Sequence, residues 1–205
     1  MSIYKKDHTV LSTSELVVNW HLTEACNYSC KYCYAAWTKP SESKAVWRSQ
    51  SHSLQLLNNI REYFDSCNDL NPLAPQMSWK SLRLSFAGGE PMLLGERFKS
   101  IVNSAATLGF KISLITNGSF LNDETLRWIA PNLSMLGISV DSNNAARNQI
   151  IGRVDSRGNM LSECNLEDII LKTRHYNPNT KIKLNTVVNA NNWDQDLRDT
   201  INRLN

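Results

Sequence analysis

Three cysteines lie close together near the start of this 205-residue sequence, in the stretch NWHLTEACNYSCKYCY. Cys26, Cys30 and Cys33 follow the irregular spacing C-x3-C-x2-C, and the other two cysteines are far away in the sequence. A disulfide framework would need paired cysteines, and a closed zinc site takes four ligands. Zinc stays open as an alternative, because His21 or one of the distant cysteines could complete such a site in space.

Three thiolates are also the protein ligands that an iron–sulfur cluster with one open iron requires. A [4Fe-4S] cluster has four irons, each usually held by one thiolate. With only three thiolates, the fourth iron is free to bind a small molecule and to pass an electron to it. We interpret Cys67 and Cys164 as isolated thiols. The chemistry needs a reducing compartment, where thiols stay free to take up a cluster.

Composition and charge exclude several classes of protein. A chain of 205 residues is of ordinary size for one domain, so we expect residues 1–205 to form a single domain. The formal net charge of +3 does not indicate a nucleic-acid partner. No stretch reaches the roughly 18 apolar residues of a membrane span, and the N-terminus lacks the apolar core of a signal peptide. We therefore expect a cytoplasmic protein with no nucleic-acid and no membrane partner.

Strand-like and helical stretches alternate along the chain. Apolar and β-branched runs predict strands at 15–22, 81–86, 111–116, 133–140 and 181–188. Apolar residues at helical spacing, with capping signals, predict helices at 44–64, 97–108, 122–129, 166–175 and from Trp193 onward. This alternation predicts an α/β fold with a parallel sheet, right-handed crossovers and five strand–helix units.

Polar and glycine residues follow the predicted strands at the points where these strands end. In a parallel α/β sheet or barrel, the ligand site lies at the carboxyl ends of the strands. The cysteine loop follows the first strand, and Gly88, Gly89 and Glu90 follow the second. Residues 116–119 and 141–142 follow the third and fourth strands. The glycines let the backbone approach a ligand, and the carboxylate can accept hydrogen bonds from an ammonium group.

Two strands also carry pairs of polar residues at alternate positions. Asn19 and His21 alternate on the first strand, and Lys183 and Asn185 alternate on the fifth. Alternate residues of a strand point to the same side, so each pair shares a face. Two polar side chains on one face of an apolar strand indicate an interior cavity. On an exposed edge, Lys183 would instead discourage aggregation.

These motifs resemble the radical S-adenosylmethionine superfamily, which has C-x3-C-x2-C with an aromatic residue before the last cysteine, here Tyr32, and GGEP after the next strand. The resemblance implies a partial (β/α)6 TIM-like barrel, of which about five β/α units are present. It implies that the three cysteines hold a [4Fe-4S] cluster whose open iron is chelated by S-adenosylmethionine. An electron from a donor such as flavodoxin or ferredoxin then releases a 5′-deoxyadenosyl radical.

A finer resemblance points to the viperin-like family within that superfamily. The segments NWH-x4-C, LGISVDS, IIGR and KIKLNTVVN are similar to the family pattern in the same order. These enzymes convert a ribonucleoside triphosphate to its 3′-deoxy-3′,4′-didehydro form, which terminates viral polymerases. The resemblance implies contacts to S-adenosylmethionine from Tyr32, Gly88, Gly89, Glu90, Ser139 and Arg153, the last two at its carboxylate. It implies contacts to the nucleotide from Asn19, His21, Lys183 and Asn185.

Two features depart from the family pattern. Tyr34 follows the last cysteine where phenylalanine is usual, and the sequence stops at Asn205, before the family's sixth strand and its basic phosphate ligands. We therefore expect a C-terminally incomplete core that binds S-adenosylmethionine better than nucleotide. Two alternatives stay open: a radical enzyme that acts on a peptide or protein, and a non-catalytic zinc- or cluster-binding protein.

Overall fold

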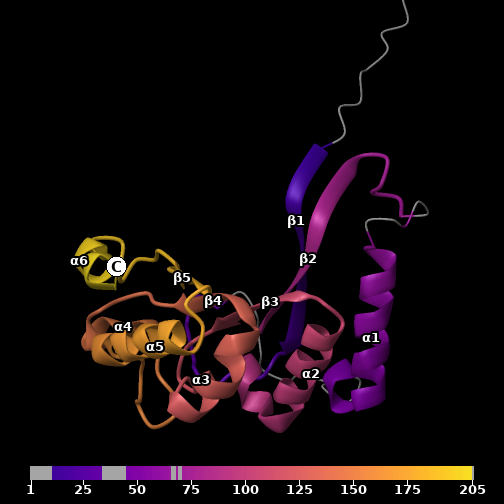
Figure 1. Cartoon of the computed structure of the whole chain (residues 1–205). Helices are drawn as coiled ribbons and strands as arrows, with labels where there is room; N and C mark the ends of the chain where they lie inside the picture. Colours follow the sequence, from indigo (N-terminus) through magenta and orange to yellow (C-terminus); the bar gives the residue numbers. More distant parts are fainter. Residues whose placement is uncertain (1–10, 34–44, 66–67, 69–70, 205) are drawn as a thin grey trace, which may run out of the picture.

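Five parallel strands form one sheet, in a computed structural model that describes residues 11–33, 45–65, 68 and 71–204 (Figure 1). The strands are β1 (Leu11–Thr23), β2 (Met77–Gly88), β3 (Lys111–Thr116), β4 (Leu133–Ser139) and β5 (Lys181–Asn185). Their spatial order equals their order in the sequence, and every neighbouring pair is parallel. Sequential parallel strands are the arrangement of a (β/α) barrel, and here five strands form an open part of one.

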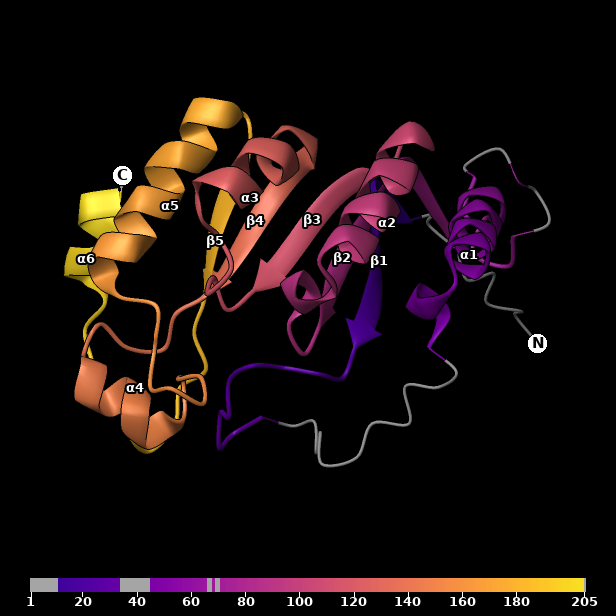
Figure 2. The same ribbon diagram turned by 90° about the horizontal axis from the view of Figure 1, so that it is seen from below.

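Helices cover one face of this sheet. They are α1 (Gln50–Tyr63), α2 (Glu96–Thr107), α3 (Asp123–Ile129), α4 (Ala145–Ile151), α5 (Glu163–Tyr176) and α6 (Arg198–Leu204). Short 3-10 turns lie at Val46–Arg48, Pro91–Leu94 and Ala130–Asn132. Figure 2 shows α1, α2, α3 and α5 side by side along the sheet, whereas α4 and the cysteine loop lie beyond the carboxyl ends of the strands.

The core lies between the strands and these helices. Alternate strand residues face the helices and are buried: Leu82, Leu84, Phe86, Ile112, Leu114, Leu136 and Ile138. From the helices, Phe98 packs edge-on against Phe86 with ring centroids 5.4 Å apart. Burial of each such large side chain contributes about 1.5–3 kcal/mol to folding. The period-2 pattern of the strands thus fixes which face meets the helices.

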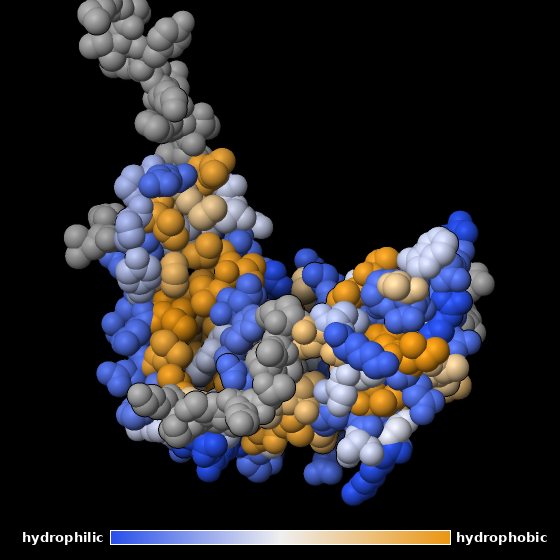
Figure 3. Space-filling model, turned by 180° about the vertical axis from the view of Figure 1, so that it is seen from behind, coloured by the Kyte–Doolittle hydropathy of each residue, from blue (hydrophilic) through white to orange (hydrophobic). Residues whose placement is uncertain are grey.

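The opposite face of the sheet is the concave face, on the side away from α1, α2, α3 and α5. The register places Asn19, Ser85, Ser113, Met135 and Lys181 beside one another across the five strands. Seen from this side, the surface is hollowed between two arms (Figure 3). Polar residues of the strands therefore lie in the hollow of a partial barrel.

One predicted helix start agrees with the structure, and one predicted helix is interrupted. The predicted cap Asn122 accepts a hydrogen bond from Thr125 N at 2.9 Å, and α3 begins at the next residue. The predicted helix 44–64 is interrupted at Ser49, which has an extended backbone and accepts a hydrogen bond from His52 N. The continuous helix was therefore wrong, and a short turn precedes α1.

The end of the chain differs most from the sequence prediction. β5 ends at Asn185, because Val187 N donates to the Asp141 carboxylate at 2.9 Å and not to a neighbouring strand. The last helix begins at Arg198 and not at Trp193, because Trp193 N closes a turn onto Asn189 O at 3.0 Å. The strand prediction was wrong for residues 186–188, and α4 was not predicted.

Tyr34, Cys67 and Asn205, which were named from the sequence, lie outside the described part of the chain. Cys164 is exposed on α5 with a free thiol, as expected for an isolated cysteine. Within the described residues, no helix is both long and apolar enough to cross a bilayer.

Candidate functional site

The cysteine loop follows β1 and is held against the end of α4. Ser29 N donates to Gly152 O at 3.1 Å, and Lys31 N donates to Ile151 O at 2.9 Å. Gly152 has a positive φ of 85°, and a β-carbon there would lie 2.2 Å from Ser29 O. Only glycine allows both this backbone conformation and this approach. The glycine that ends α4 therefore fixes the loop that carries the cysteines.

The glycine pair after β2 holds the other side of the same loop. Gly89 N donates to Thr23 O and Glu90 N donates to Ala25 O, both at 2.8 Å. A β-carbon on Gly89 would lie 2.0 Å from Ala25 O, and one on Gly88 would lie 2.4 Å from Thr23 O. The close approach that these glycines permit in this structure is to the start of the cysteine loop. Their expected contact with S-adenosylmethionine stays a prediction.

Glu90 is completely buried beneath this loop. One carboxylate oxygen accepts hydrogen bonds from Met92 N at 3.1 Å and Thr116 Oγ1 at 2.8 Å, and the other accepts one from Asn117 N at 2.8 Å. Burial raises the pKa of Glu90, and these donors oppose that shift. The carboxylate thus braces the ends of β2 and β3, a role that the sequence did not predict. Its expected contact with the cofactor ammonium group stays a prediction.

The three thiols of the loop are half-buried, and those of Cys26 and Cys30 accept hydrogen bonds. Cys26 Sγ accepts from Tyr28 N at 3.4 Å and from Asn117 Nδ2 at 3.9 Å. Cys30 Sγ accepts from Arg153 Nη1 at 3.7 Å. Burial raises the pKa of the Cys26 thiol, and the hydrogen bonds from Tyr28 and Asn117 oppose that shift, as a bound iron would.

Arg153 lies inside the site and not on a surface loop, with only 7% of its surface exposed. Its Nη2 donates to Ser139 O at 2.5 Å, and its Nε lies 3.5 Å from Asp141 Oδ2. The guanidinium carbon lies 5.3 Å from the ring centroid of Tyr28. Tyr32 donates a hydrogen bond to the same oxygen of Asp141. The two residues expected at the cofactor carboxylate, Ser139 and Arg153, are therefore neighbours.

The residues expected to contact nucleotide lie on the concave face. Asn19 and His21 alternate on β1, where His21 pairs with Ala87 of β2. At the other edge of the sheet, Lys183 pairs with Gly137, and Asn185 follows two positions later on β5. The side chains of Asn19, His21 and Lys183 are exposed, and that of Asn185 is half-buried. The two polar pairs thus flank the hollow from its two edge strands.

Asn117 and Asp141 were placed after their strands by the sequence but received no role. In the structure, Asn117 contacts Cys26, and Asp141 contacts Tyr32 and Arg153. Both residues could have been identified from the sequence, because each is an amide or a carboxylate directly after a buried strand, where ligand sites of parallel sheets lie.

The donor set fits a cluster of several irons better than a single metal ion. In the part of the chain that the structure describes, no three His, Cys, Asp or Glu side chains converge as the ligands of one ion. A [4Fe-4S] cluster takes each thiolate on a different iron, so its ligands lie farther apart. Three half-buried thiols beside a buried guanidinium suit a cluster with negative charge.

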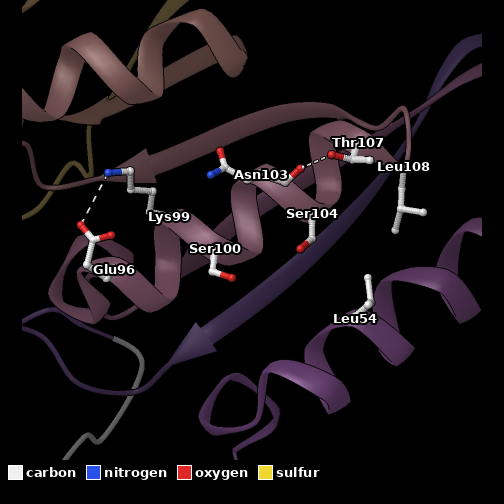
Figure 4. Close-up of a pocket in the computed structure, with 8 residues that line it drawn as sticks. All are labelled: Leu54, Glu96, Lys99, Ser100, Asn103, Ser104, Thr107 and Leu108. Atoms are coloured by element: carbon white, nitrogen blue, oxygen red, sulfur yellow. Dashed lines mark hydrogen bonds and ion pairs between the residues drawn. The ribbon is translucent and has the colours of Figure 1, made fainter.

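A groove on the helical side of the molecule contains no cysteine and none of the predicted site residues among the described residues that line it. It lies between α1 and α2 with a volume of about 420 Å³ (Figure 4). Leu54 lines it from α1, and mostly polar side chains, including the Glu96–Lys99 ion pair, line it from α2. The helical layer separates it from the concave face, so we do not assign it to the site.

The family model and the relatives that match this chain are of the kind that the sequence motifs indicated. Residues 20–166 match the family model described as the Radical SAM superfamily. An S-adenosylmethionine-dependent nucleotide dehydratase of Pseudoalteromonas ulvae is 43% identical, covering 94% of this chain and 62% of its own length. A protein of the same name from Psychrobacter lutiphocae is 37% identical, covering 97% of this chain and 64% of its own. The chain thus spans a little under two thirds of these relatives.

Among solved structures, the fold is similar to that of "Native anSMEcpe with bound AdoMet". The TM-score is 0.60 at 18% identity, with 95% of this chain and 47% of that chain covered. This likeness bears on the fold alone, and it confirms the expected partial barrel.

Proposed function

The chain belongs to the Radical SAM superfamily, and we propose that its substrate is a ribonucleoside triphosphate, which is converted to the 3′-deoxy-3′,4′-didehydro form. A [4Fe-4S] cluster and S-adenosylmethionine are the cofactors of this superfamily. The name of the 43% identical relative, a nucleotide dehydratase, supports a nucleotide substrate. A product of this kind lacks the 3′-hydroxyl that a polymerase extends, which suits antiviral defence by chain termination.

The cofactors are assigned to the end of the partial barrel where the cysteine loop lies. Cys26, Cys30 and Cys33 hold the cluster, and S-adenosylmethionine is bound by Tyr32, Gly88, Gly89, Glu90, Ser139 and Arg153. When bound together, the two cofactors supply a 5′-deoxyadenosyl radical that removes one hydrogen atom from the substrate. The chain's own contribution is to orient both ligands, because only near-attack geometry lets a radical select one C–H bond.

The observation that carries the substrate assignment is that two polar pairs face the same hollow from its two edge strands. Asn19 and His21 face the hollow from β1, and Lys183 and Asn185 face it from β5. We assign the first pair to the ribose and the second to the phosphates, because an exposed ammonium group can offset part of the triphosphate charge. Both pairs lie toward the end of the sheet that carries the cysteine loop.

The reaction also needs an electron for each radical that is formed. A small redox protein such as flavodoxin or ferredoxin is the proposed donor, and a reducing cytoplasm is the proposed location. Flavodoxin and ferredoxin, each in its reduced state, can be tested as replacements for a chemical reductant.

The test uses anaerobically reconstituted protein with S-adenosylmethionine, dithionite and each ribonucleoside triphosphate in turn. We expect one nucleotide to be converted to a product lighter by one water, together with 5′-deoxyadenosine. Substrate deuterated at C4′ should transfer its label to 5′-deoxyadenosine. Label transfer from C3′ alone, or formation of 5′-deoxyadenosine with every nucleotide left intact, would contradict the proposal.

A further inference from the structure

The carboxylate of Asp141, directly after β4, joins three separate segments of the chain. Its side chain has no exposed surface. Oδ2 accepts a hydrogen bond from Tyr32 in the cysteine loop and lies 3.5 Å from Arg153 Nε, just after α4. Oδ1 accepts a hydrogen bond from Val187 N, in the loop after β5, at 2.9 Å. The cysteine loop, the cofactor arginine and the loop after the substrate strand thus share one carboxylate.

The contact with Asp141 gives the buried Arg153 an anionic partner. A guanidinium with 7% exposure has lost most of its hydration, and a buried charge is costly unless it is paired and hydrogen-bonded. Its Nη2 and Nη1 also contact Ser139 O at 2.5 Å and Cys30 Sγ at 3.7 Å. Partners at Nε, Nη1 and Nη2 fix the plane of the guanidinium.

The position of Asp141 is itself fixed by the loop after β5. Asn192 Nδ2 donates to Asp141 O and to Val187 O, both at 2.9 Å. Thr186 Oγ1 donates to Val140 O at 2.7 Å, one residue before Asp141. These bonds hold the backbone, and the carboxylate cannot turn away from Arg153 without breaking its hydrogen bond from Val187 N.

We propose that Asp141 is a positioning residue for S-adenosylmethionine, which acts by fixing the orientation of Arg153. This inference rests on the proposed assignment of Arg153 to the cofactor carboxylate. An arginine held in one plane binds a carboxylate with little loss of side-chain freedom, because its fork is already oriented. Supporting residues of this kind keep the ligand-binding shell in place and are needed for affinity.

The test compares four reconstituted proteins: wild type, Asp141→Asn, Arg153→Lys and the double variant. Asparagine keeps the size of the side chain, and its carbonyl can still accept from Val187 N. The amide NH₂ in place of Oδ2 cannot accept from Tyr32 or pair with Arg153. We expect Asp141→Asn to weaken S-adenosylmethionine binding about ten- to a hundredfold, measured by anaerobic calorimetry, with iron and sulfide content unchanged.

The double variant separates positioning from a general structural role. If Asp141 acts through Arg153, the double variant should bind S-adenosylmethionine no more weakly than Arg153→Lys alone, since coupled residues are non-additive. The electron paramagnetic resonance spectrum of the reduced cluster should change on adding S-adenosylmethionine in the wild type, and much less in Asp141→Asn at the same concentration. This readout does not depend on turnover.

A matched control lies between α3 and α5, on the helical side of the sheet. Asp123 accepts hydrogen bonds from Tyr176 Oη at 2.8 Å and Arg127 Nη2 at 3.0 Å, the same acid–tyrosine–arginine chemistry. Asp123→Asn should bind S-adenosylmethionine as the wild type does. If Asp141→Asn does not fold, Asn192→Ala removes the amide that holds Asp141 O and Val187 O, a residue with no assigned ligand contact, and should still weaken binding several-fold.

Each of the following results would overturn the proposal, and the last would overturn the assignment on which it rests as well. Unchanged affinity in folded Asp141→Asn would show that the carboxylate does not position the cofactor arginine. Additive losses in the double variant, or loss of cluster in step with loss of affinity, would reduce Asp141 to a structural residue. Wild-type affinity in Arg153→Lys would instead overturn the assignment of Arg153 itself, and the proposal with it.

Discussion

The side-chain amide of Asn185 on β5 lies against Gly137 on β4, on the concave face of the sheet. A β-carbon at Gly137 would lie 3.0 Å from Asn185 Nδ2, closer than the amide tolerates without moving. The Asn185 nitrogen is buried and has no hydrogen-bond partner within the described structure. A buried donor without a partner is costly, so we expect a bound nucleotide to supply one.

Gly137→Ala should therefore weaken nucleotide binding by displacing the Asn185 amide. The loss of one hydrogen bond to a charged or polar ligand group corresponds to about tenfold in affinity. Titration calorimetry with the preferred nucleotide measures this loss, and S-adenosylmethionine affinity in the same protein is the internal control. Asn185→Ala should have a similar effect, and the double variant should be little worse. Unchanged nucleotide affinity in both single variants would remove Asn185 from the substrate site.

The cluster assignment predicts a sharp difference among the cysteines. Replacing Cys26, Cys30 or Cys33 by alanine should abolish cluster assembly and S-adenosylmethionine cleavage, because each thiolate holds one iron. Cys164→Ala should change neither, because that thiol is exposed on α5. Cluster assembly is measured by iron and sulfide content and by the absorbance at about 400 nm, which is typical of such clusters. A Cys30→Ala protein with a full cluster would contradict the ligand set.

Gly89→Ala should disturb the cysteine loop from the side of β2. The added β-carbon would meet Ala25 O at 2.0 Å, so the hydrogen bonds that join residues 89–90 to residues 23–25 must lengthen or break. Forced overpacking of this kind costs about 1–3 kcal/mol of unfolding free energy. Urea denaturation measures that loss, and cluster content should fall with it. Ser78→Ala, exposed at the other end of β2, is the control and should leave both unchanged.

Much of the fold was predictable because the hydrophobic pattern fixes the strands. The predicted strand 111–116 coincides with β3, and its alternate residues are buried against the helices as the pattern requires. α4 was missed because a helix over 145–151 is too short for apolar periodicity to show. Residues typical of its two ends, Asn144 before the helix and Gly152 after it, were present in the sequence.

The chemistry of the site was only partly predictable, because it depends on contacts between distant segments. The cysteine spacing and the glycine pair indicated the cofactor end of the barrel. The hydrogen bond from Tyr32 to Asp141 spans 109 positions of the sequence, and the contact of Arg153 with Cys30 spans 123. Side-chain pairs of this kind follow from the meeting of loops in space, which no local pattern encodes.

Acidification should weaken the link between α3 and α5. The hydrogen bond from Tyr176, followed by that from Arg127, lowers the pKa of Asp123 below its ordinary value of 3.8. A carboxyl with a lowered pKa in the folded state contributes stability above its unfolded pKa and loses it as the pH falls through the folded value. Wild type should thus lose more thermal stability than Asp123→Asn on acidification from about pH 6 to about pH 3. An equal fall in melting temperature for the two apo proteins across this pH range would contradict a stabilising role of Asp123 between α3 and α5.

The last prediction separates two lysines of β5. Lys181 and Lys183 are two positions apart on the same face and are both exposed, but Lys183 lies nearer the carboxyl end of the strand, where the cysteine loop is. A triphosphate carries about four negative charges near neutral pH and needs several cationic contacts to offset its desolvation. One charged contact contributes about 1.5–3 kcal/mol, so Lys183→Met should weaken nucleoside triphosphate binding about tenfold or more.

Lys181→Met is the matched control, because it removes the same charge from the same strand. If the phosphates lie at Lys183, the control should keep nearly the affinity of the wild type, and the salt dependence of nucleotide binding should become shallower only in Lys183→Met. S-adenosylmethionine affinity should be the same in both variants. Equal, modest losses in the two variants would mean that β5 attracts the nucleotide through its general positive charge. In that case Lys183 makes no specific contact, and the phosphates must be bound by other cations of the protein.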